Sequence, residues 1–148
     1  MAHGLIDAWL ALLDASYPVS IQQADIIMPV PLSPQRLIER GFNQSCELAK
    51  LISKITNLPC KNYWLKRIHI EHSQAQSNKE NRFKQLNNVF YMEKKHQACI
   101  KNQNILLVDD VMTSGATLHT IAKLLKSLGA QKITNWVALR TPTNNSYD

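Results

Sequence analysis

The chain has 148 residues, of which 45% are hydrophobic and 19% charged, and it carries a formal net charge of +6. This length predicts a single domain, residues 1–148, with its own hydrophobic core, and the composition excludes a disordered or fibrous chain. The excess of Lys and Arg favours anionic partners, although a basic protein without such a partner is an equally good interpretation.

The cysteines and the N-terminal segment indicate the compartment. Cys46, Cys60 and Cys99 are too widely spaced for a CxxC zinc site and too few for a disulfide framework, so we expect reduced thiols in a cytoplasmic protein. Residues 1–20 predict an amphipathic helix, because two aspartates interrupt its apolar pattern. That pattern fits neither a signal peptide nor a membrane span, so we expect no membrane insertion.

The first half of the chain predicts a strand and a helix. Ala24–Leu32 is short and continuously apolar, as in a strand buried on both faces, and its prolines must lie at its very end. The segment from Ser33 to Pro59 predicts a helix, because four apolar residues share one face. These residues are Leu48, Leu51, Ile52 and Ile55.

Further strands are expected within Tyr63–His69 and Asn88–Met92. The tract between them is polar, so we expect a mobile flap over residues 66–88. Asn104–Val108 predicts a central strand, and the helix that follows it should end at Gly129. A last strand is expected over Lys132–Thr141.

Strands that alternate with helices predict an α/β fold, with a mainly parallel sheet and helices on both faces. Ligands of such sheets bind beyond the carboxyl ends of the strands. Chemically distinctive residues follow Val30, His69 and Val108. We therefore expect all three places to meet at this edge.

A phosphate-binding loop is expected where the central strand passes into its helix. The backbone N–H groups of a first helical turn have no partner within the helix, and the helix dipole favours an anion there. Three hydroxyls can add donors, and a glycine lets the backbone approach closely. The residues concerned are Thr113, Ser114, Gly115, Ala116 and Thr117.

Two adjacent carboxylates, Asp109 and Asp110, precede this loop. Because like charges repel, they must face another part of the ligand. Carboxylates accept hydrogen bonds from vicinal hydroxyls and hold Mg²⁺ directly or through water. An acid pair beside a phosphate site therefore predicts a ribose 5-phosphate ligand, with Mg²⁺ as its cofactor.

Other interpretations fit less well. Either motif alone would most simply be a turn cap or a helix start, but here strand, acid pair, hydroxyl loop and helix occur together. The chain has no GxxxxGK[ST] and no GxGxxG, which excludes a P-loop and a dinucleotide fingerprint. A receiver domain would need about a hundred further residues after its acids, and only 38 follow Asp110.

The stretch ILLVDDVMTSGATL closely resembles the phosphoribosyl pyrophosphate (PRPP) motif of type I phosphoribosyltransferases. MPVPLSPQRLIERGFNQSCELAKLI and LKRIHIEHSQAQSNKENRFKQLNNVF are similar to two blocks of the ComF/GntX family, competence-associated proteins related to amidophosphoribosyltransferase. The resemblance covers roughly residues 24–141. It implies a type I phosphoribosyltransferase-like fold.

The resemblance also implies roles for particular residues. Asp109 and Asp110 would face the ribose hydroxyls, and Thr113 to Thr117 would hold the 5-phosphate. The loop next to the pyrophosphate would consist of Val30, Pro31, Leu32 and Ser33, and the flap that covers it would carry Arg67, Gln74 and Arg82. We expect Asp109, Asp110 and Arg82 to be catalytic, and Arg40 and Arg67 to bind ligand, whereas Arg36 is interpreted as a solvated surface cation.

The chain departs from the family pattern in two ways. The family usually begins with a four-cysteine zinc ribbon, which this chain lacks, so no zinc is expected. The flap has Gln85 where the family has Asn, and Glu71 where it has Thr.

Two hypotheses for function follow. The first is a PRPP-binding protein that, if catalytic, transfers phosphoribosyl to a nitrogen nucleophile and releases pyrophosphate. The second is a non-catalytic accessory factor in DNA uptake that holds single-stranded DNA on its basic surface. The sequence names neither the acceptor nor the oligomeric state, and its basic clusters lack the interleaved aromatics of a base-stacking surface.

Overall fold

The computed structural model describes residues 19–68 and 89–141. The expected N-terminal helix over 1–20 and the flap over 66–88 fall almost entirely outside these residues. The described elements are α2 (Val19–Gln22), β1 (Ile26–Pro29), α3 (Pro34–Arg40), α4 (Gln44–Thr56), β2 (Leu65–Arg67), β3 (Phe90–Met92), α6 (Lys94–Gln97), the 3₁₀ helix η1 (Ala98–Ile100), β4 (Asn104–Met112), α7 (Ala116–Ser127) and β5 (Lys132–Arg140).

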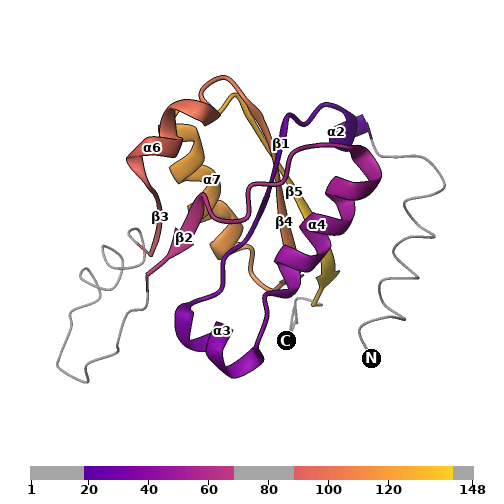
Figure 1. The fold of residues 1–148 in the computed structure, drawn as a ribbon, viewed down its shortest axis with the longest axis vertical. Helices are drawn as coiled ribbons and strands as arrows, with labels where there is room; N and C mark the ends of the chain where they lie inside the picture. Colours follow the sequence, from indigo (N-terminus) through magenta and orange to yellow (C-terminus); the bar gives the residue numbers. More distant parts are fainter. Residues whose placement is uncertain (1–18, 69–88, 142–148) are drawn as a thin grey trace, which may run out of the picture.

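A three-stranded parallel sheet forms the centre of the molecule in the order β1-β4-β5 (Figure 1). β4 lies between its neighbours, with Ile26 opposite Ile105 on one side and Asn104 opposite Lys132 on the other. Outside β1, Cys60 makes a single parallel bridge to Ile27. The expected α/β fold with a parallel sheet is confirmed.

Two helices cover opposite faces of this sheet. Successive strand residues point to opposite faces, so alternate residues of β1 and β4 enter two different cores. Ile105 and Leu107 pack with Leu118, Ile121 and Leu125 of α7. Leu106 and Val108 pack with the other helix through Leu48, Ala49 and Ile52 of α4. Burial on both faces explains why β4 reads as a continuous apolar run.

The segment expected to form one helix after the first strand forms two. α3 ends at Gly41, which has a φ of 78°, a left-handed conformation that glycine adopts without steric cost. α4 begins after Asn43, whose side chain accepts a hydrogen bond from the Ser45 backbone N–H. Three of the four expected apolar-face residues lie in or against the core: Leu48, Ile52 and Ile55.

The strand expected within Tyr63–His69 is not part of the parallel sheet. β2 pairs with β3 in a separate antiparallel sheet, with Leu65 opposite Met92. Antiparallel strands need no crossover helix between them, whereas parallel strands do. The expectation that the end of this strand shares the edge of the parallel sheet was wrong.

β4 extends to Met112, four residues beyond its expected end at Val108. The extension exists because β5 continues beside it, pairing Val111 with Leu139 and Met112 with Arg140. The acid pair therefore lies within the strand. The helix after it ends at Ser127, and Gly129, with a φ of 98°, follows as the expected left-handed stop.

Candidate functional site

The acid pair occupies the carboxyl-terminal half of the central strand. Asp109 lies opposite Val137 of β5, so its backbone is held by the sheet. Its side chain is buried, whereas that of Asp110 is half-buried. A carboxylate fixed at this depth is oriented before any ligand arrives.

Ser45, in the first turn of α4, connects the two carboxylates. Its Oγ lies 3.2 Å from Oδ1 of Asp109 and 3.3 Å from Oδ1 of Asp110. The same Oγ accepts the backbone N–H of Asp110 at 3.1 Å. Because a hydroxyl has one proton, it donates to one carboxylate at a time.

The surroundings of Asp109 disfavour its ionised form. Burial raises the pKa of Asp109 to about 6, and the negative charge of Asp110 acts in the same direction. Hydrogen bonds from the Ser45 hydroxyl and the Asp110 backbone act against this increase. The neighbouring negative charge thus adds to burial in disfavouring the ionised form of Asp109.

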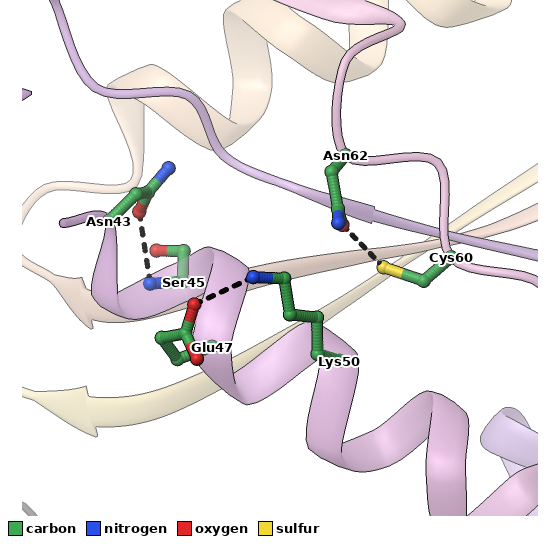
Figure 2. A network of polar contacts seen from close by, with 6 residues as sticks. All are labelled: Asn43, Ser45, Glu47, Lys50, Cys60 and Asn62. Carbon is green, nitrogen blue, oxygen red and sulfur yellow. Dashed lines mark hydrogen bonds and ion pairs between the residues drawn. The ribbon is translucent and has the colours of Figure 1, made fainter.

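The start of α4 is also tied to the end of β1. Figure 2 shows Asn43 and Ser45 side by side at the beginning of this helix. The Asn43 amide donates to the carbonyl oxygen of Val30 at 3.0 Å, and the Val30 N–H donates to Val108 on β4. One helical turn thus joins the two strand ends that the ligand would contact.

The loop from Met112 to Ala116 surrounds a small cavity of about 40 Å³ at the N-terminus of α7. A water molecule needs roughly 10–15 Å³, so the cavity is of the size of a few such groups. Gly115 precedes α7 with a φ of 77° and supplies no side-chain cap. The first-turn N–H groups other than that of Ala116 are therefore available to an anion.

All five residues expected to form the phosphate loop line this cavity: Thr113, Ser114, Gly115, Ala116 and Thr117. Asp109 lines it too. Ser114 Oγ accepts the Ala116 N–H at 3.4 Å, which is a long hydrogen bond. Asp109 of the acid pair thus lies in the wall of the same cavity as the loop residues, and Asp110 does not line it.

The loop after β1 borders a separate and larger groove of about 470 Å³. Pro31 and Leu32 line the groove, and buried Ser33 accepts the Arg36 N–H at 3.4 Å to cap α3. Arg67 also lines the groove, and its guanidinium lies over the Phe90 ring at 5.5 Å. Burial lowers the pKa of Arg67, and the nearby charge of Arg36 lowers it further.

The remaining predicted residues are less centrally placed or outside the described residues. Arg40 is exposed, and its guanidinium donates to Gln44 at 3.4 Å. Arg82 and Gln74 lie outside the described residues, so their expected roles in the flap stay predictions.

The donor set fits Mg²⁺. Hydrogen bonds among the described residues engage Oδ1 of Asp109 and of Asp110, and none engages Oδ2 of either. Mg²⁺ is commonly held by one or two carboxylates together with ligand phosphates and water. Within residues 19–68 and 89–141, no group of three or more His, Cys, Asp or Glu gathers. Phosphate oxygens of a ligand and water are the usual groups that would complete such a coordination shell.

Ser45 and Asn43 were not among the site residues predicted from the sequence. Asn43 carries a local signal, since Asn before an amphipathic helix is a common N-cap. Ser45 carries none, because its partners lie 64 and 65 positions further along the chain.

Comparison with known proteins shows which proteins the chain is similar to. The family model described as phosphoribosyl transferase domain matches residues 48–146. Competence protein F of Haemophilus influenzae is 34% identical over 132 residues, covering 86% of this chain and 56% of that protein. DNA utilization protein YhgH of Escherichia coli is 31% identical over 132 residues, covering 89% and 56%. The expected resemblance to the ComF proteins is confirmed, and the chain spans about half the length of these relatives.

A solved structure shows the same fold. The purine phosphoribosyltransferase of Pyrococcus horikoshii superposes with a TM-score of 0.56 at 17% identity, covering 93% of this chain and 83% of that one. No helix in the described part of the chain is long and apolar enough to cross a membrane.

Proposed function

The chain belongs to the phosphoribosyl transferase domain family, and from this premise we propose that it binds PRPP, a ribose 5-phosphate ligand, at the carboxyl ends of β1 and β4. One observation carries the proposal: a cavity sized for a phosphate lies at the start of α7, with Asp109 in its wall and Asp110 beside it. A terminal phosphate and a vicinal diol on one ligand match these two neighbouring features.

Each group of residues has a part in this proposal. The loop from Thr113 to Thr117 holds the 5-phosphate through first-turn N–H groups and hydroxyls. Asp109 and Asp110 accept hydrogen bonds from the ribose hydroxyls through their free Oδ2 atoms. The loop from Val30 to Ser33 borders the pyrophosphate, and Arg67 offers its positive charge from β2.

The same arrangement suits transfer of the phosphoribosyl group to a nitrogen nucleophile. The bond from the anomeric carbon to pyrophosphate breaks, and a bond from nitrogen to that carbon forms. The carboxylates lie where they stabilise the positive charge that develops on the sugar. Bound Mg²⁺ would neutralise part of the charge on the departing pyrophosphate, and the two Oδ2 atoms are its candidate ligands.

The free thiols Cys46, Cys60 and Cys99 support a cytoplasmic site of action.

Titration calorimetry with PRPP and Mg²⁺ tests the proposal. We expect the native protein to bind and the Asp109→Asn/Asp110→Asn variant to lose at least tenfold in affinity, about 1.4 kcal/mol, because hydrogen bonds to charged groups contribute about 1.5–3 kcal/mol each. Asp25→Asn is a matched control, since this exposed carboxylate lies at the opposite end of β4 and accepts the Asn104 N–H. Equal affinity of the native protein and the double variant would remove the acid pair from the site.

A second candidate function is favoured by the groove. Its lining includes the exposed rings of Phe42, Tyr63 and Tyr91, together with the cations Lys66 and Arg67. Aromatic rings beside cations are the usual means of holding single-stranded nucleic acid. The relatives named for competence and DNA utilization support this choice. We propose that the groove holds single-stranded DNA while the phosphate site is retained.

Fluorescence anisotropy with a labelled oligothymidylate tests the groove. Tyr63 is 79% exposed, so replacing it with alanine should leave the fold intact and weaken DNA binding at least fivefold, because one base stack contributes about 1–3 kcal/mol. Ile38→Ala is the control, because Ile38 is 84% exposed on α3 and does not line the groove. Equal losses in both variants, or none in either, would contradict the proposal.

A further inference from the structure

The Ser45 hydroxyl is not used by its own helix. Serine near a helix start ordinarily caps the first turn, but here the Asn43 side chain does so by accepting the Ser45 N–H at 3.0 Å. The hydroxyl instead reaches β4. Ser45 is 2% exposed, so this is a buried polar contact between elements that are distant in the sequence.

We propose that Ser45 is a positioning residue, whose hydroxyl orients Asp109 and Asp110 so that the carboxylates accept the hydroxyls of a ribose. This inference rests on the proposed binding of a ribose 5-phosphate. The Ser45 Oγ contacts the Oδ1 atom of each carboxylate, at 3.2 Å and 3.3 Å, and the same Oγ accepts the Asp110 backbone N–H. The hydroxyl donates its one proton to either Oδ1 atom in turn, which keeps both Oδ1 atoms directed at Ser45 and leaves the Oδ2 atoms for the ligand.

The same helical turn relates the acid pair to the loop after β1. Asn43 holds the Val30 carbonyl through its amide and holds Ser45 through its carbonyl oxygen. Any shift of the start of α4 would therefore move the carboxylates and this loop together. The geometry fits a ligand whose sugar and pyrophosphate must be aligned at once.

The phosphate cavity depends on Ser45 only through Asp109, whose carboxylate repels an anion and does not bind it. Its walls come from the end of β4, the following loop and the first turn of α7, and Ser45 does not line it. Loss of the Ser45 hydroxyl should therefore affect recognition of the sugar and leave recognition of the phosphate unchanged. A merely structural role would weaken both, because it would act through the stability of the whole site.

The test compares ribose 5-phosphate with inorganic phosphate, both titrated by calorimetry without Mg²⁺. We expect Ser45→Ala to weaken ribose 5-phosphate binding at least tenfold and to change phosphate binding less than twofold. Ser45→Thr, which keeps the hydroxyl, should restore ribose 5-phosphate affinity to within about threefold. Ser53→Ala is the matched control, because it removes a hydroxyl of the same helix that donates to the Leu58 carbonyl at 2.6 Å.

The outcomes separate the two proposals. If the native protein binds neither ligand, the proposed function fails, and this inference with it. If the native protein binds ribose 5-phosphate and Ser45→Ala binds it equally well, or loses both ligands equally, the inference alone is wrong. Should Ser45→Ala not fold, Ser45→Cys keeps the side-chain shape with a weak donor and is tested against the same two ligands.

Discussion

At the scale of single residues, the acid pair costs stability. Burial and Asp110 raise the pKa of Asp109 to about 6, whereas an aspartate in the unfolded chain releases its proton near 3.8. Between these values the folded protein binds more protons than the unfolded chain. The contribution of Asp109 to stability therefore decreases as pH rises from about 4 to about 6. Residues kept for function often carry such a cost.

Asp109→Asn should remove this cost. We expect the free energy of unfolding of the variant, relative to the native protein, to increase from pH 4 to pH 7, because only the native protein must bury a charge at the higher pH. Urea unfolding at several pH values, without Mg²⁺ or ligand, measures the difference, with Asp25→Asn as an exposed control. A difference that is constant with pH, or that decreases as pH rises, would contradict the raised pKa.

At the scale of elements, the turn into α7 and the turn out of α3 share one backbone conformation. Gly115 has a φ of 77° and Gly41 a φ of 78°. Gly115 lines the small cavity at the start of α7, where a Cβ would lie 3.5 Å from Met112 Sδ, whereas a Cβ on Gly41 would meet nothing within 4 Å. Substituting each of these two glycines in turn therefore separates the effect of backbone strain from the effect on the cavity loop.

Alanine at either position should destabilise the protein by about 1–2 kcal/mol, because a residue with a Cβ adopts the left-handed conformation at that cost. Only Gly115→Ala should also weaken phosphate binding, since it changes the cavity loop. Thermal unfolding and calorimetry with inorganic phosphate measure the two effects. Equal phosphate affinity in both variants would mean that the anion does not bind at the start of α7.

At the scale of the whole molecule, the groove gathers side chains that are far apart in the sequence. Phe42, Tyr63 and Tyr91 come from three separate segments and meet Lys66 and Arg67 around one cavity. Tyr63 lies in the same segment as Lys66 and Arg67, and the fold adds the rings of Phe42 and Tyr91 from two other segments. With a net charge of +6, DNA titrated onto this surface should dissociate with rising salt, log K falling by about 0.7 for each phosphate neutralised. A flat salt response would exclude a backbone contact.

The central sheet, the two covering helices and the candidate phosphate loop could be predicted from sequence. Their signals are local: the apolar run of β4, the periodic apolar face of α7, and the hydroxyls around Gly115 fall within one stretch of chain. A strand buried on both faces and a helix with one apolar face leave few other arrangements.

The tertiary structure alone decided the rest. Whether β2 joins the parallel sheet depends on its pairing with β3, and the true end of β4 depends on β5 beside it. Ser45 meets Asp109 only because α4 packs across β1 and β4. Contacts between distant segments have no period or spacing in the sequence, so the residue that holds the acid pair was identified only from the folded chain.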